Sequence, residues 1–204
     1  MKVKVKICGI RCIKAAKVAV GEGADFLGFN FVPTSKRYID PALAAKIINL
    51  VEGRIKIVGI FQNAESVYVN DIASKLGLNF VQLHGNENAE YINQIKVAVI
   101  KTINVYNQLQ KLNVDYFLLD RVKQGEGKMV DLKKGTQVAS KVRLFLAGGL
   151  TPDNVAGLIK TVKPFAVDVA GGIETDGKED LNKIKAFIKN AKEVVFKQSL
   201  QTCL

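Results

Sequence analysis

The sequence has no tryptophan, one histidine and only three cysteines among its 204 residues. No two histidines or cysteines stand at the spacing of metal ligands, so we expect no metal site. An odd number of cysteines in a chain of this length does not indicate a disulfide framework, and it fits a reducing compartment. We therefore expect a cytoplasmic protein without a metal site or structural disulfides.

Long apolar runs are also missing. The longest, such as "FAVDVA" at 165–170, have the length of a strand and are too short to span a bilayer. The first residues, "MKVKVKI", lack the apolar region of a secretory signal, and the last, "KQSLQTCL", lack a prenylation motif because the cysteine is second from the end. The sequence thus predicts no association with a membrane, and residues 194–204 are expected to form a C-terminal tail.

Acidic residues are scarce, with 19 Asp and Glu against 30 Lys and Arg, which gives a net charge of +11. This balance favours a negatively charged partner: a nucleic acid, an anionic membrane surface, or a phosphorylated and carboxylated metabolite. The lysines are spread through helix-like segments and form no basic block interleaved with aromatic residues, as binding of single strands would require. We therefore expect a small phosphorylated substrate and no nucleic acid.

Short segments rich in Val, Ile, Leu and Phe alternate with longer segments at helical spacing. Strands are predicted at VKVKIC (3–8), DFLGFNF (25–31), IKIVGIF (55–61), NFVQLH (79–84), VAVIKTI (97–103), DYFLLD (115–120), RLFLAG (143–148) and FAVDVA (165–170). The clearest helices are predicted at 12–22, 41–52, 65–77, 151–161 and 180–193. The fourth of these is expected to have Thr151 as N-cap and Pro152 at its first position. After the fifth strand we expect no more than a turn or two of helix.

Eight repeats of strand and helix, with nearly continuous apolar strands, predict a closed parallel barrel. This is an α/β fold of the (β/α)8 TIM-barrel type, expected as a single domain over residues 1–204, and an open doubly wound sheet is the alternative. In a barrel the functional residues lie where the strands end. Polar side chains at or after those ends are Cys8, Arg37, His84, Asp120, Asp131 and Asp168.

Cys8 ends the first strand and is followed by a glycine. It could be an inert small side chain or a thiolate with a chemical role. A thiolate can accept a proton and the carboxylic acid of Asp131 can donate one, which together suffice to isomerise a sugar without a cofactor. Asp131 could also serve as the N-cap of the helix that begins "LKKG", and the glycines beside Glu126 would let the preceding loop close over a ligand.

Arg37 could pair with a planar carboxylate through two parallel hydrogen bonds, or be a solvated loop charge. His84, the only histidine, is expected to orient a substrate or to be structural rather than to act as acid or base. Paired glycines follow the seventh and eighth strands, where backbone amides can approach an anion, so we expect a phosphate site there. The glycines are Gly148, Gly149, Gly171 and Gly172.

A set of motifs occurs in order over residues 3–193: "KICGI", "GFNF" with "SKRYI", "VGIF", "VQLHG", "LLD", "GEGK" with Asp131, "LAGGL" and "FAVDVAGGIE". Together they resemble phosphoribosylanthranilate isomerase, the barrel enzyme of tryptophan biosynthesis. The resemblance implies an Amadori rearrangement of N-(5-phosphoribosyl)anthranilate to 1-(2-carboxyphenylamino)-1-deoxyribulose 5-phosphate, without metal or nucleotide. It implies Cys8 as general base, Asp131 as general acid and Arg37 at the anthranilate carboxylate. The two glycine loops would hold the phosphate, and His84 and Asp168 are also placed at the substrate.

The chain departs from the family pattern in two places. The aromatic residues that usually flank the acid are Val130 and Leu132, and the usual "SSG" is Ala170 followed by two glycines, which removes hydroxyl contacts to phosphate but keeps the backbone amides. The alternatives are a related phosphosugar barrel, such as the histidine-pathway isomerase or indoleglycerol phosphate synthase, and a basic nucleic-acid-binding module. Cys8 speaks against the histidine-pathway isomerase, and the synthase's lysine acid has no clear match. The oligomeric state stays open, with a homodimer as one option.

Overall fold

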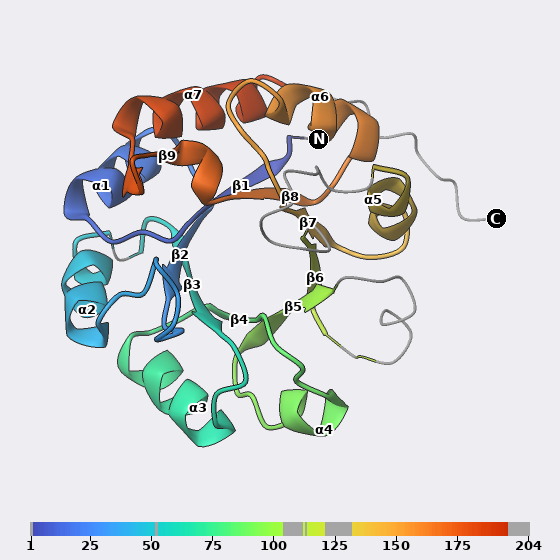
Figure 1. The fold of residues 1–204 in the computed structure, drawn as a ribbon. Helices are drawn as coiled ribbons and strands as arrows, with labels where there is room; N and C mark the ends of the chain where they lie inside the picture. The colour runs from blue at the N-terminus through green and yellow to red at the C-terminus, as the bar shows by residue number, and fades with distance from the viewer. Residues whose placement is uncertain (1, 52, 104–111, 113, 121–131, 196–204) are drawn as a thin grey trace.

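The computed structural model describes residues 2–51, 53–103, 112, 114–120 and 132–195. Eight parallel strands close into a barrel in the order β1 to β8, and helices surround it (Figure 1). The barrel closes because β8 pairs with β1, with Asp168 opposite Lys6. The predicted closed barrel is therefore confirmed, and the open doubly wound sheet is wrong.

The barrel strands agree with the predicted segments to within one or two residues at each end. They are β1 (Lys4–Cys8), β2 (Phe26–Asn30), β3 (Lys56–Phe61), β4 (Phe80–Leu83), β5 (Ala98–Ile103), β6 (Tyr116–Leu119), β7 (Leu144–Leu146) and β8 (Ala166–Val169). The helices are α1 (Ile13–Gly21), α2 (Pro41–Asn49), α3 (Ser66–Lys75), α4 (Ala89–Ile92), α5 (Leu132–Ala139), α6 (Val155–Val162) and α7 (Leu181–Lys192). The short helix expected after β5 lies outside the described residues.

The chain after β8 contains elements that the sequence does not predict. These are a 3-10 helix, η2 (Gly171–Ile173), and a hairpin of β9 (Glu174–Thr175) and β10 (Lys178–Glu179). The predicted tail also needs a correction at its start, because Val194 is buried and Val195 forms a bridge with Lys2. The rest of that segment lies outside the described residues.

Helix starts follow from local side chains. Asp40 accepts hydrogen bonds from the N–H groups of Ala42 (2.8 Å) and Leu43 (3.3 Å), and so caps α2. The expected start of α6 is wrong, because the helix begins at Val155 with Asn154 as its N-cap. Instead, Asn154 Oδ1 accepts from the Thr151 N–H (2.8 Å) and Thr151 Oγ1 accepts from the Asn154 N–H (3.4 Å). These two bonds close a turn ahead of the helix.

Side chains inside the barrel form layers, because alternate residues of a strand face opposite sides. In β1, Val5 and Ile7 belong to the apolar core that the helices cover, while Lys6 and Cys8 face the interior. Aromatic rings fill the amino-terminal end of the barrel, with edge-to-face contacts at centroid distances of 5.2 to 5.7 Å. They belong to Phe26, Phe80, Tyr116 and Phe145. Each such pair contributes about 0.5–1.5 kcal/mol beyond its buried area, so that end is a packed core and polar chemistry is left to the carboxyl end.

Among the described residues, no helix has both the length and the apolar character needed to cross a membrane.

Candidate active site

Cys8 lies at the carboxyl end of β1, as predicted, and its side chain is partly exposed. Gly28, its partner on β2, gives the thiol room, because a Cβ atom at that position would lie 2.9 Å from the Cys8 Sγ. Burial raises the pKa of the Cys8 thiol above its ordinary value, the neighbouring Lys6 ammonium opposes that rise, and Asp168 adds to it. The thiol is therefore held mainly protonated, directly above a positive charge.

Lys6 is fully buried in the barrel interior, two residues before Cys8. Its Nζ donates to Gln82 Oε1 (2.8 Å) and Asp168 Oδ1 (3.0 Å). Desolvation alone would lower the pKa of Lys6, but the Asp168 carboxylate and the hydrogen bonds to Asp168 and Cys8 outweigh it and the pKa is raised, so the ammonium stays charged. The sequence does not single out Lys6, although the alternation in "VKVKIC" places it on the same face as Cys8.

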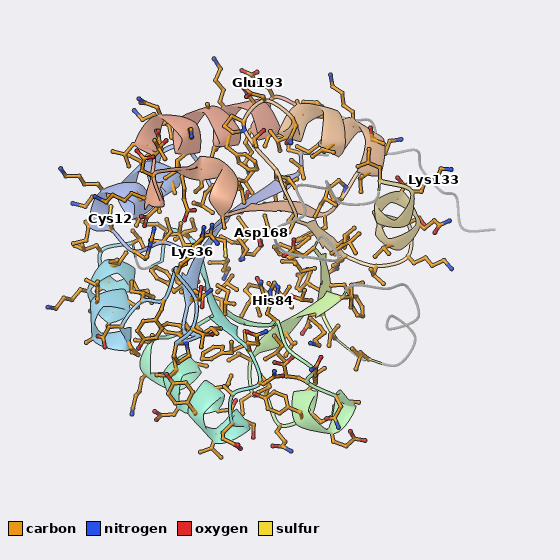
Figure 2. The ribbon with its side chains drawn as sticks, viewed as in Figure 1. Cys12, Lys36, His84, Lys133, Asp168 and Glu193 are labelled. Atoms are coloured by element: carbon orange, nitrogen blue, oxygen red, sulfur yellow. The ribbon has the colours of Figure 1, made fainter. Side chains whose placement is uncertain are left out.

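Asp168 was expected at the substrate, and the structure gives it a protein partner, Lys6, inside the barrel. His84 follows β4, and Figure 2 shows His84 and Asp168 near the centre of the barrel. The His84 Nδ1 lies 3.2 Å from Thr102 Oγ1, and Nε2 lies 3.7 Å from Asp120 Oδ2. Burial lowers the pKa of His84 against the opposing charges of both aspartates, so the imidazole is neutral near pH 7 and suits an orienting role.

Arg37 also lies at this rim, but one edge of its guanidinium is already paired. Nε and Nη2 donate to the two carboxylate oxygens of Glu174, each at 2.7 Å. The arginine stem crosses the backbone at Gly9, where a Cβ atom would lie 2.5 Å from Arg37 Cδ. The sequence does not predict the role of Glu174, and its only signal is the motif "AGGIE" in which it stands.

The two glycine loops meet at the carboxyl ends of β7 and β8. A Cβ atom at Gly172 would lie 1.9 Å from Leu150 O, so only glycine allows these backbones to pack together. Gly148 and Gly149 have φ values of 87° and 82°, which other residues rarely adopt. The N–H groups of Gly148, Gly149, Gly171 and Gly172 have no acceptor in the part of the chain that the structure describes. Free amides of this kind can hold an anion.

Asp131 and Glu126 lie outside the described residues, and α5 begins at the next residue, Leu132. Within the described ranges, no group of three or more His, Cys, Asp or Glu side chains could hold a metal ion.

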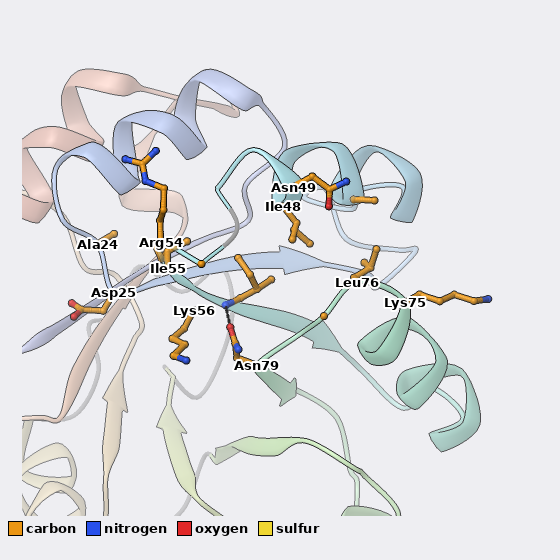
Figure 3. A pocket seen from close by; sticks show the side chains of 14 residues that line it. Ala24, Asp25, Ile48, Asn49, Arg54, Ile55, Lys56, Lys75, Leu76 and Asn79 are labelled. Carbon is orange, nitrogen blue, oxygen red and sulfur yellow. Dashed lines mark hydrogen bonds between the residues drawn. The ribbon is translucent and has the colours of Figure 1, made fainter.

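A cavity of about 610 Å³ lies near the other end of the barrel, beside the ends of α2 and α3, and none of the four packed aromatic side chains lines it. Figure 3 shows residues that line it, among them Asp25, Lys56 and Asn79, which precede or begin β2, β3 and β4. It is therefore at the amino-terminal ends of the strands, away from Cys8. Active sites of such barrels lie at the carboxyl ends, so this cavity is not the candidate site.

Comparison with known proteins gives one consistent result. A family model described as N-(5'phosphoribosyl)anthranilate (PRA) isomerase matches residues 5–190. The N-(5'-phosphoribosyl)anthranilate isomerase of Trichlorobacter lovleyi is 40% identical over 204 residues, which cover 95% of this chain and 100% of the relative. That of Geobacter sp. (strain M21) is 39% identical over 201 residues, which cover 94% and 98%.

Solved structures agree. The phosphoribosyl anthranilate isomerase from Thermotoga maritima matches with a TM-score of 0.85 and 41% identity, covering 94% of this chain and 100% of that one. A phosphoribosyl anthranilate isomerase in complex with reduced 1-(o-carboxyphenylamino)-1-deoxyribulose 5-phosphate matches with a TM-score of 0.82 and 39% identity, with the same coverage. With the barrel and its carboxyl-end residues in place, the chain belongs to the N-(5'-phosphoribosyl)anthranilate isomerases, enzymes of tryptophan biosynthesis.

Proposed function

We propose that Cys8 is the general base and Asp131 the general acid of the Amadori rearrangement of N-(5-phosphoribosyl)anthranilate to 1-(2-carboxyphenylamino)-1-deoxyribulose 5-phosphate. The observation that carries the proposal is the position of Cys8. Its thiol stands at the carboxyl end of β1, beside the buried ammonium of Lys6. A base there has a counter-charge for its thiolate and access to a ligand at the rim.

The reaction then needs two proton transfers. Asp131 protonates the ring oxygen of the furanose, which opens to a Schiff base. Cys8 removes the proton from C2′, and the resulting enolamine tautomerises to the ketone. The burial that raises the thiol pKa also makes the thiolate, once formed, a stronger base. The atoms rearrange without net redox change, so no electron carrier takes part.

The other rim residues would bind the substrate. The four free glycine amides would hold the 5′-phosphate, and Arg37 would meet the anthranilate carboxylate. His84, as a neutral imidazole, would orient the sugar. Asp168, held in place by its ion pair with Lys6, would bind the substrate beside His84. The complex of the related isomerase with a reduced phosphorylated product supports this class of substrate.

Assembly and location follow from the same relationship. The T. maritima isomerase is described as dimeric, and we propose a homodimer for this chain on that ground. We also propose a single catalytic domain that acts in the cytoplasm, where the free thiol of Cys8 would stay reduced.

The test is a turnover assay. The purified protein, dialysed against a chelator and given no nucleotide, should consume freshly generated phosphoribosylanthranilate, followed by the loss of anthranilate fluorescence. Inorganic phosphate should compete weakly for the glycine amides. No fluorescence change at micromolar enzyme, with folding verified by circular dichroism, would refute the proposed reaction.

A further inference from the structure

The Arg37 guanidinium is held by a bidentate ion pair with Glu174. Glu174 takes its Nε–H and one Nη2–H, both at 2.7 Å, and the Glu174 carboxylate is only 8% exposed. Arg37 itself is 20% exposed, so the pair is largely withdrawn from water. A bidentate pair of this kind fixes the plane of the guanidinium as well as its position.

Glu174 is fixed in turn by its surroundings. It begins β9 and pairs across the hairpin with Glu179. The Glu174 backbone oxygen accepts from Lys183 Nζ (2.8 Å), and Arg11 Nη2 lies 3.6 Å from its Oε1. Arg11 is tied to the same hairpin through Glu179 Oε2, at 3.3 Å. The loops after β1, β2 and β8 therefore meet at this one carboxylate.

The pairing leaves a defined part of Arg37 for a ligand. Glu174 occupies the side edge formed by Nε and Nη2, so the end edge formed by Nη1 and the second Nη2–H remains. Nη1 has no acceptor among residues 2–51, 53–103, 112, 114–120 and 132–195. Gly171 keeps this end open, because a Cβ atom there would lie 3.2 Å from Nη2.

The local charge also suits one more anion. Arg37, Arg11 and Lys36 all act on Glu174, whose partner across the hairpin is Glu179. Together with the lysine that bonds the Glu174 backbone oxygen, four cations face these two carboxylates, which leaves a net positive charge at this part of the rim. A planar carboxylate can therefore bind the end edge of Arg37 without facing a net negative cluster.

We propose that Glu174 is a positioning residue that turns the end edge of Arg37 toward the aromatic carboxylate of the substrate. This inference rests on the proposed function, because that reaction supplies a substrate with such a carboxylate. Glu174 touches no substrate atom in this role. It sets the direction of the guanidinium, and so selects a ligand with a carboxylate at that point.

The test compares Glu174→Gln with the control variant Glu179→Gln. The control removes the same charge from the same hairpin, but Glu179 makes no hydrogen bond to Arg37. The probe is reduced 1-(o-carboxyphenylamino)-1-deoxyribulose 5-phosphate, with its counterpart that lacks the ring carboxylate as control ligand, and Kd is measured by calorimetry. Glu174→Gln should weaken binding of the carboxylated probe about tenfold and leave the control ligand unchanged within about twofold. Glu179→Gln should bind the carboxylated probe no more weakly than the parent does, and the control ligand like the parent.

The sign of the change separates positioning from simple charge. Removal of a carboxylate makes the rim more positive, so electrostatics alone would tighten the carboxylated probe in both variants. Tighter or unchanged binding in Glu174→Gln overturns the proposal, and so does an equal loss for the ligand without a carboxylate. With substrate, the loss should appear in KM while kcat changes less than about threefold.

Arg37→Lys gives a second route if Glu174→Gln does not fold, because it keeps the charge and loses the planar fork. It should also weaken the carboxylated probe about tenfold, and where Glu174→Gln does fold, adding it to Arg37→Lys should weaken binding no further. If Arg37→Lys binds the carboxylated probe with parental affinity, the end edge of the guanidinium does not hold the carboxylate and the proposal is refuted. A parent that neither binds the probe nor turns over substrate instead refutes the proposed function, and this inference with it.

Discussion

Removing the Lys6 ammonium should destabilise the barrel strongly. In Lys6→Met the stem is replaced by a side chain of similar length, but Asp168, whose side chain is 8% exposed, loses its cation and Gln82 Oε1 loses its donor. Breaking a buried pair by removing one partner costs about 3–5 kcal/mol. Against a total stability of about 5–15 kcal/mol, this loss should lower Tm by roughly 6–20 °C.

The size of the loss should depend on pH in a definite direction. Burial already raises the pKa of Asp168, and Lys6 opposes that rise, so without Lys6 the folded-state pKa climbs further. The folded variant then keeps a proton that the unfolded chain releases, and its stability falls as pH rises above the ordinary carboxyl range. Destabilisation should be smaller near about pH 5 than near about pH 8.

Urea unfolding followed by circular dichroism measures both effects. The double variant Lys6→Met/Asp168→Asn should recover part of the loss, because no unpaired charge is left in the barrel. A loss below about 1 kcal/mol at both pH values would match an exposed ion pair and refute the buried arrangement.

Burial holds the pKa of the Cys8 thiol above its ordinary value, so its alkylation by iodoacetamide should still accelerate beyond about pH 9. The rate is measured with the other two cysteines, Cys12 and Cys203, changed to Ser, and a plateau below about pH 8 would contradict this. Arg37→Ala should raise KM more than it lowers kcat and cost a few kcal/mol of binding, so equal inhibition of parent and variant by the reduced product would argue against it. Gly172→Ala should lower the free energy of unfolding in urea by about 1–3 kcal/mol, because its Cβ would overlap Leu150 O at 1.9 Å. Gly157→Ala in α6, where a Cβ would meet nothing within 4 Å, should raise it by about 0.5–1 kcal/mol. Equal stability of the two variants would refute the close packing of the loops.

The sequence predicts the barrel well because its signals are local. Each strand is a short run of β-branched, leucine and phenylalanine residues, and α2 starts where Asp40 and Pro41 stand together. The ends of the strands then place Cys8, His84 and the glycine pairs at one rim by geometry alone. Those positions depend only on strand order and direction.

The contacts that tune the site are not local, so the sequence does not predict them. Lys6 and Asp168 are 162 residues apart, and Arg37 and Glu174 are 137 residues apart. Each pair forms only because the barrel closes β8 against β1 and brings the loop after β2 beside the hairpin. That hairpin has two residues in each strand, too few to give an alternating pattern.

The most direct test of the account is the turnover of Cys8→Ala at saturating substrate, beside Asp131→Asn. Loss of a positioned general base lowers kcat by about a hundredfold to ten-thousandfold. We expect a loss of that size in Cys8→Ala, with an unchanged circular dichroism spectrum and parental affinity for the reduced product, and an impaired kcat in Asp131→Asn. Near-parental turnover by folded Cys8→Ala would contradict the central claim that the thiol at the end of β1 removes the C2′ proton.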